Sequence, residues 1–236
     1  MTEMREGEYI VTMEDVPVCA AGGAAGRLLK TLFDRILAFI GLLILLPLFA
    51  LIALLIRLDS PGPVFFRQMR VGKDGRLFRI YKFRTMVVNA EQIGLGVHTR
   101  ADDPRITRVG RVLRKLSLDE LPQLINILKG EMSFVGPRPT LPYQVLRYNP
   151  RQKGRLLVPP GVTGWAQIHG RRALTWPERI EYDIWYVEHW SPWLDLVILL
   201  RTLPAVLTAR GVDDAGIGDE ISRLEPAETP SDDGKV

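Results

Sequence analysis

The chain has 236 residues, of which 47% are hydrophobic and 25% are charged, and its formal net charge at pH 7 is +4. This length suits one domain with appendages. Cys19 is the only cysteine, which excludes both an intramolecular disulfide and a cysteine metal cluster.

The positive charge is concentrated in the middle of the chain. Residues 1–20 carry five acidic side chains and one basic one, and residues 211–236 carry eight acidic and two basic ones. Residues 21–210 therefore hold 28 basic against 14 acidic side chains. Such a core suits an anionic membrane leaflet, a phosphate-bearing substrate or a nucleic acid.

A leader at residues 1–26 is acidic, then rich in alanine and glycine, and is expected to be flexible. An uncharged apolar run follows at residues 36–56, and a membrane-spanning helix needs about 20 such residues. Pro47 lies near its midpoint, where it removes a backbone donor. Basic residues flank the run on both sides, and such residues prefer the cytoplasmic side. We therefore predict a re-entrant membrane helix at residues 27–58, bent at Pro47; a kinked single span is the alternative.

Residues 59–210 are predicted to form a cytoplasmic domain that begins with a β-hairpin. Short strands are expected at residues 64–67 and 77–84, joined by a turn at residues 72–75. Arginine and lysine crowd this segment, and we interpret most of them as a solvated edge beside anionic lipid.

Helices are predicted in the rest of this domain. The apolar spacing at residues 106–116 indicates one helix, and a second at residues 124–128 is ended by Gly130. Residues 180–187 are also expected to be helical. Residues 192–209 are apolar but interrupted by charge, which is typical of a helix lying in the membrane interface. The acidic segment 211–236 is predicted to be a disordered tail.

Asp119 and Glu120 are the strongest candidates for chemistry. They lie at the start of the second helix, just after several arginines. One interpretation is structural, because Ser117 and Glu120 have the spacing of a helix capping box. The other is a phosphate site, in which free helix amides and guanidinium groups bind the anion. A carboxylate there can bind Mg²⁺ or attack phosphorus itself.

Six short motifs, taken together and in order, resemble one family. The chain is similar from about residue 30 to about residue 202 to the bacterial sugar transferases, the monotopic phosphoglycosyl transferases that act on polyprenyl phosphate. The motifs are Lys82–Met86, Asp103–Thr107, Ser117–Gln123, Lys129–Ser133, Val135–Pro139 and Pro160–Trp165.

The resemblance implies a reaction. A UDP-sugar gives its sugar-1-phosphate to undecaprenyl phosphate at the cytoplasmic face of the bacterial inner membrane, and UMP is released. The product begins the assembly of a surface glycan. No nucleic acid is implied as a partner, and the sugar and the oligomeric state stay open.

The resemblance also implies roles for individual residues. Asp119 and Glu120 match a catalytic pair that works with Mg²⁺, in which Asp119 is the nucleophile and a metal ligand and Glu120 assists. Arg114 matches a phosphate-binding arginine, and Pro137, Arg138 and Pro139 match a substrate-contacting turn.

The resemblance extends to the membrane segment as well. In similar enzymes a Ser-Pro pair breaks the re-entrant helix, and Leu46-Pro47 stands at that position here. The expected fold class is therefore a mostly helical α/β monotopic membrane protein with a re-entrant helix, a small catalytic domain and a short β-hairpin. The chain is expected to be the minimal catalytic unit with its own leader and tail.

Two other classes of protein are alternatives. A membrane-anchored basic protein that binds anionic lipid or nucleic acid would show salt-sensitive binding without turnover. A multipass polyprenyl-phosphate transferase would need several spans, whereas this sequence has one long apolar run.

Overall fold

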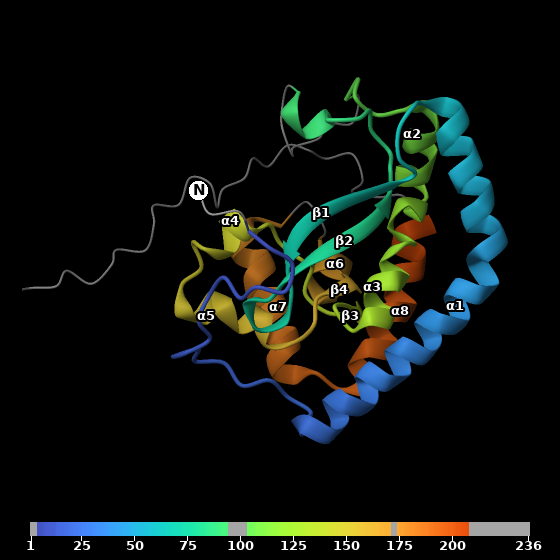
Figure 1. Cartoon of the computed structure of the whole chain (residues 1–236). Coiled ribbons are helices and arrows are strands. Elements are labelled where there is room, and N and C mark those ends of the chain that lie inside the picture. Colours follow the sequence, from blue (N-terminus) through green and yellow to red (C-terminus); the bar gives the residue numbers. More distant parts are fainter. Residues whose placement is uncertain (1–3, 94–102, 171–173, 208–236) are drawn as a thin grey trace, which may run out of the picture.

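A computed structural model describes residues 4–93, 103–170 and 174–207, and it confirms a mostly helical α/β fold (Figure 1). The α-helices are α1 (Gly23–Asp59), α2 (Arg108–Lys115), α3 (Gln123–Lys129), α4 (Pro142–Val145), α5 (Pro150–Lys153), α6 (Trp165–His169), α7 (Trp176–His189) and α8 (Pro192–Leu207). The strands are β1 (Phe65–Val71), β2 (Leu77–Phe83), β3 (Ser133–Val135) and β4 (Gly161–Thr163). Short 3-10 turns complete the order: η1 (Lys73–Gly75), η2 (Ala90–Gln92), η3 (Leu118–Glu120) and η4 (Gly154–Leu157).

The predicted β-hairpin is confirmed. Strands β1 and β2 pair antiparallel, with Phe65 opposite Phe83 and Val71 opposite Leu77. The chain reverses at η1, where Asp74 and Gly75 both have positive φ angles, 55° and 81°. Strand β1 is longer than predicted, because it continues through the basic residues that precede the turn.

A second sheet was not predicted. It pairs β3 with β4 in parallel, in the register Ser133 opposite Gly161 and Val135 opposite Thr163. A Cβ on Gly161 would lie 2.1 Å from the backbone nitrogen of Gly136. Glycine is therefore needed where these two backbones approach, and the approach brings two of the six motifs together.

Helix α1 is continuous from Gly23 to Asp59, with Pro47 inside it. The break that the resemblance implies at Leu46-Pro47 is therefore wrong, because the helix continues through Pro47. Figure 1 shows α1 bowed as a whole around the domain, with α3 on its concave side. The physical reason is that an internal proline removes one hydrogen bond and tilts the axis, which the flanking turns can accommodate without ending the helix.

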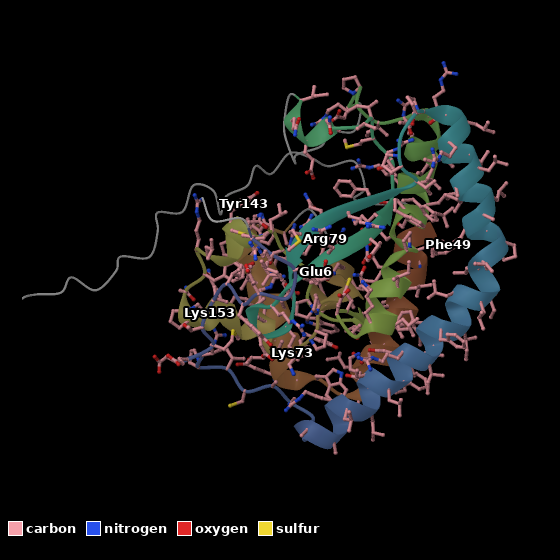
Figure 2. All side chains as sticks on the ribbon, in the orientation of Figure 1. Glu6, Phe49, Lys73, Arg79, Tyr143 and Lys153 are labelled. Atoms are coloured by element: carbon pink, nitrogen blue, oxygen red, sulfur yellow. The ribbon has the colours of Figure 1, made fainter. Side chains whose placement is uncertain are left out.

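The two sides of α1 differ sharply. Ala38, Ile52 and Ile56 face the domain and are at most 2% exposed. Phe49, labelled in Figure 2, packs against Phe83 of β2 with a ring-centroid distance of 5.1 Å. The helix is long and apolar enough to cross a membrane, yet only 11% of its most apolar window is buried in the protein. The rest is an exposed apolar surface, which is typical of a site that contacts a membrane or another protein.

The leader differs from the prediction. Flexibility was expected for residues 1–26, but residues 7–10 hydrogen-bond at the turn end of the hairpin, and the Ala21 amide donates to the Val187 carbonyl of α7. The Gly7 amide donates to the Leu77 carbonyl at 2.8 Å. Figure 2 shows Glu6 beside Arg79, with 3.5 Å between Glu6 Oε2 and Arg79 Nε. The leader holds enough apolar side chains between its charges to pack on the domain, and composition alone did not reveal this.

Three apolar clusters form the core. The largest joins the leader residue Val18 to the turn end of the hairpin and to α7. The other two lie under α1, one against β2 and α3 and one against Phe83 and α2. Helix α1 therefore packs on the domain along both of its halves.

The remaining predicted helices are confirmed with shifted ends. The segments 106–116, 124–128, 180–187 and 192–209 correspond to α2, α3, α7 and α8. Gly130 ends α3 with a φ of 81°, as predicted. The predicted tail at residues 211–236 lies outside the described residues.

Candidate active site

Asp119 and Glu120 lie in η3, between α2 and α3, and do not cap a helix. The capping box expected from Ser117 and Glu120 is wrong. Ser117 has a φ of 55° and its side chain makes no capping hydrogen bond. The Glu120 side chain points instead to two cations from distant parts of the chain. Glu120 therefore forms ion pairs with distant cations and does not cap a helix.

Glu120 is held by Lys82 of β2 and by Arg138. Lys82 Nζ donates to Glu120 Oε1 at 2.8 Å, and Arg138 Nη2 donates to the same oxygen at 2.6 Å. The Glu120 side chain is 17% exposed. Burial disfavours its charged form, but the charges of Arg138 and Lys82 outweigh burial and hold the pKa of Glu120 well below its ordinary value. Glu120 is thus a fixed carboxylate.

Asp119 has the opposite character. Its carboxylate makes no hydrogen bond or ion pair with any residue in the described ranges. Burial raises its pKa to about 6, against the lowering effect of Lys82, and the negative charge of Glu120 adds to the rise. A partly desolvated, unpaired carboxylate beside a paired one is suited to act as a nucleophile.

The other predicted residues surround this pair. Arg114 lies in α2, and its positive charge lowers the pKa of Asp119. Arg138 projects from the turn after β3, between the buried residues Pro137 and Pro139. Pro47 belongs to α1 and not to the charged cluster.

Sequence reasoning missed Lys82, Arg70 and Gln123. Together with Ile80, Arg138 and Pro139 they line a small hollow beside Glu120. Burial, and then the nearby Arg138, lower the pKa of Arg70 to about 10. The interpretation of most basic hairpin residues as a solvated edge does not hold for Lys82 and Arg70. The period-2 alternation of β2 could have shown that Lys82 shares a face with the buried Phe78 and Ile80.

The expected Mg²⁺ can be tested against the side chains present. The described part of the chain contains no group of three or more His, Cys, Asp or Glu side chains able to hold a metal. Mg²⁺ in phosphoryl-transfer sites, however, is held by one or two carboxylates together with substrate phosphates. The unpaired Asp119 carboxylate fits that requirement, whereas Oε1 of Glu120 already accepts from two cations.

Comparison with known proteins defines the class. The profile of the bacterial sugar transferase family matches residues 25–209. The chain is therefore a member of the bacterial sugar transferase family, as the motifs indicated.

Several characterised relatives are similar to this chain. The UDP-glucose:undecaprenyl-phosphate glucose-1-phosphate transferase of Escherichia coli is 42% identical over 209 residues, 85% of this chain and 44% of that protein. The UDP-N-acetylgalactosamine-undecaprenyl-phosphate N-acetylgalactosaminephosphotransferase of Aeromonas hydrophila is 47% identical over 189 residues, 78% of this chain and 44% of that protein. The exopolysaccharide production protein ExoY of Rhizobium meliloti is 40% identical over 224 residues, 89% of this chain and 97% of that protein. The chain thus spans nearly all of one relative and less than half of the other two.

Proposed function

We propose that this protein transfers a sugar-1-phosphate from a UDP-sugar to undecaprenyl phosphate, with Asp119 as the nucleophile. The observation that carries the proposal is the contrast within the carboxylate pair: Glu120 is held by Lys82 and Arg138, whereas Asp119 is unpaired and has a raised pKa. The Escherichia coli and Aeromonas hydrophila relatives are both named for transfer to undecaprenyl phosphate from a UDP-sugar, which supports the same donor and acceptor classes here.

The proposed reaction has two balanced steps. In the first, a carboxylate oxygen of Asp119 attacks the β-phosphorus, the bond from that phosphorus to the bridging oxygen breaks, and UMP leaves with that oxygen. In the second, a phosphate oxygen of the lipid attacks the same phosphorus and the acyl phosphate bond breaks. Asp119 is then a carboxylate again, and the product is a polyprenyl diphosphate sugar. One site thus serves two bulky anions in turn.

The surrounding cations stabilise the charge on the transferring group. Arg138 and Lys82 donate hydrogen bonds to Glu120, and Arg114 lies close enough to lower the pKa of Asp119. Fixed positive groups aimed at a transferring phosphoryl group account for much of the catalysis in such sites. Asp119 and the substrate phosphates would hold Mg²⁺, which when bound supplies further neutralisation of phosphate charge.

The re-entrant course of α1 is part of the proposal, and contacts at both ends of the helix support it. Near its start, Lys30 Nζ lies 2.5 Å from Asp195 Oδ2 of α8. At its end, Asp59 Oδ2 accepts from the Val109 amide of α2 at 2.9 Å. Both ends therefore bind the same domain, which favours a helix that enters and leaves the membrane by one face over a single span.

The buried guanidinium of Arg84 fixes the end of α1. Its Nη1 donates to the Pro61 carbonyl at 2.6 Å, and its Nη2 donates to the Ser60 carbonyl at 2.7 Å. These donors satisfy carbonyls at the point where the chain leaves the helix. With basic residues on both flanks, the face on which the domain lies is proposed to be cytoplasmic.

The sugar is not specified by this argument. The relatives named above differ in the sugar that they carry, glucose in one case and N-acetylgalactosamine in the other. A screen of UDP-glucose, UDP-galactose and the two N-acetylated donors, read out as UMP release, would identify it.

The experiment that tests the proposed function compares Asp119→Asn with the wild type. Purified protein is mixed with Mg²⁺, undecaprenyl phosphate and each UDP-sugar, and UMP is measured. We expect loss of UMP release in Asp119→Asn while the protein still partitions into membranes. Asp74→Asn, an exposed position in the hairpin turn, is the matched control and should behave as wild type. Salt-sensitive lipid binding without turnover, unchanged by Asp119→Asn, would support the basic binding protein instead.

A further inference from the structure

The turn that carries Arg138 is held at four consecutive carbonyl groups, and each accepts from a different donor. The Pro137 carbonyl accepts from the Gly161 amide at 2.9 Å, and the Thr140 carbonyl accepts from the Val71 amide at 3.0 Å. Between them, the carbonyls of Arg138 and Pro139 accept from arginine side chains. Prolines at 137 and 139 lack amide hydrogens, so the turn depends on these carbonyls for its attachment.

Arg155 of η4 supplies the donor for the Arg138 carbonyl. Its Nη2 lies 2.9 Å from that oxygen and 2.5 Å from Asp183 Oδ2 of α7. Its Nη1 donates to the Tyr148 hydroxyl at 2.6 Å. The side chains of Arg155 and Asp183 are each 1% exposed. The guanidinium is therefore oriented by a carboxylate and a hydroxyl before it reaches the turn.

The direction of the Arg138 side chain depends on where its backbone lies. Arg138 spans the distance from the turn to Glu120, where Nη2 is 2.6 Å from Oε1, and its own side chain is 43% exposed. With close to half of the side chain exposed, packing holds it only in part, and the backbone anchor sets its reach. A displacement of about 1 Å at a positioning residue can cost roughly 10²-fold in rate.

We infer that Arg155 is a positioning residue for the transfer reaction: by binding the Arg138 carbonyl from behind the turn, it holds the Arg138 guanidinium at Glu120 and at the phosphate of the substrate. This inference rests on the proposed function, because it assigns Arg138 to the transferring group. It adds a residue outside the six motifs and away from the carboxylate pair.

A purely structural role is the competing explanation, since a buried ion pair whose partner is removed is costly to stability. Arg155→Lys separates the two roles. Lysine retains the charge beside Asp183, but a single ammonium cannot reproduce the planar fork that reaches Asp183, Tyr148 and the turn together. Arg151→Lys is the matched control. Arg151 is close to Arg155 in the sequence, but it forms an exposed ion pair with Glu181.

Two measurements test the inference. The first is hydrogen exchange of the peptide that covers residues 136–144, which needs no activity. Arg155→Lys should speed exchange there, and Arg151→Lys should not. The second is a double-mutant cycle in kcat/KM for UMP release. Arg155→Lys should lower kcat/KM by about 10–100-fold, and should cause little further loss in an Arg138→Met background because both act through one side chain.

The outcomes are distinguishable. Unchanged exchange at 136–144, or a kinetic effect of Arg155→Lys that is undiminished by Arg138→Met, overturns the inference. If Arg155→Lys alone fails to fold, Tyr148→Phe, which removes one of the groups that orient Arg155, replaces it and should show the same pattern more weakly. A wild-type protein that turns over no donor refutes the proposed function, while the exchange result still decides whether Arg155 holds the turn.

Discussion

Lys82 donates to Glu120 across 2.8 Å and so joins the second strand of the hairpin to the turn that carries the carboxylate pair. The two residues are 38 positions apart, and the contact exists only because β2 and η3 pack together. It divides the roles of two adjacent carboxylates: Glu120 is neutralised by cations, and its neighbour Asp119 is left unpaired. The predictions below test this division and the anchoring of α1.

The first prediction concerns Lys82. Lys82→Met should lower kcat/KM for UMP release by about 10²–10³-fold, the usual cost of removing one electrostatic contact to a reacting group. Lys82→Arg should retain more activity because the charge persists. Lys73→Met, on the exposed turn of the same hairpin, is the control. Equal losses in Lys82→Met and Lys73→Met would argue against a role for Lys82 in the site.

The second prediction concerns the loss of folding stability caused by the charged form of Asp119. Its folded pKa of about 6 exceeds its ordinary value of 3.8, so the folded protein binds this proton more tightly than the unfolded chain. Stability therefore falls as the pH rises from about 4 to about 6, and the loss is complete above that range. With a chelator present to remove metal ions, the free energy of unfolding of Asp119→Asn at pH 7.5 should exceed that of the wild type by on the order of 1–3 kcal/mol.

Thermal unfolding at several pH values checks this prediction. The advantage of Asp119→Asn should shrink towards pH 4, because the Asp119 carboxyl of the folded wild-type protein is then almost fully protonated and carries no charge. A variant that is less stable than wild type at pH 7.5 would show that Asp119 is stabilised by partners in the folded protein.

The third prediction concerns the course of α1. Cys19→Ser provides a background without cysteine, and single cysteines then replace Leu28, Ile44 or Leu58, which are 71%, 71% and 76% exposed. In sealed vesicles, a membrane-impermeant thiol reagent should label positions 28 and 58 from the same side and leave position 44 unlabelled. Labelling of 28 and 58 from opposite sides would establish a single span.

The fourth prediction concerns the contact between α1 and β3. Ser133 Oγ donates to Asp34 Oδ2 at 2.6 Å, and both residues are buried. Ser133→Ala should lower the free energy of unfolding by about 1.5–3 kcal/mol, the usual contribution of a hydrogen bond to a charged group. Thr31→Ala, whose hydroxyl bonds only within α1, should cost less. Equal effects would mean that the Ser133 contact does not secure the helix to the domain.

Much of the secondary structure followed from local signals. Turn residues located the hairpin and Gly130 the end of α3, and apolar spacing located α2. What could not be predicted depends on pairing between distant segments. The parallel pairing of β3 with β4 requires the close approach of Gly136 and Gly161. No local sequence pattern indicates that these two glycines lie next to each other.

The site shows the same limit. The sequence predicted Asp119, Glu120 and Arg138 as site residues, but not the pairing of Glu120 with Arg138 and Lys82, because that pairing depends on the tertiary fold. The capping interpretation of Ser117 is wrong for this reason: the Glu120 side chain binds Lys82, which the tertiary fold places beside it, and forms no capping box with Ser117. Pro47 predicted a break in the membrane helix, but α1 runs through it without interruption, and both halves of the helix pack on one domain.

The central claim is that Asp119 becomes covalently bound to the sugar phosphate. The most direct measurement is the intact mass of the protein after brief incubation with Mg²⁺ and the UDP-sugar that supports turnover, without lipid phosphate, followed by peptide mapping. We predict an added mass of one sugar phosphate on the peptide that contains Asp119, discharged on addition of undecaprenyl phosphate and missing in Asp119→Asn. UMP release that requires lipid phosphate from the start, with no protein adduct at any time, would contradict it.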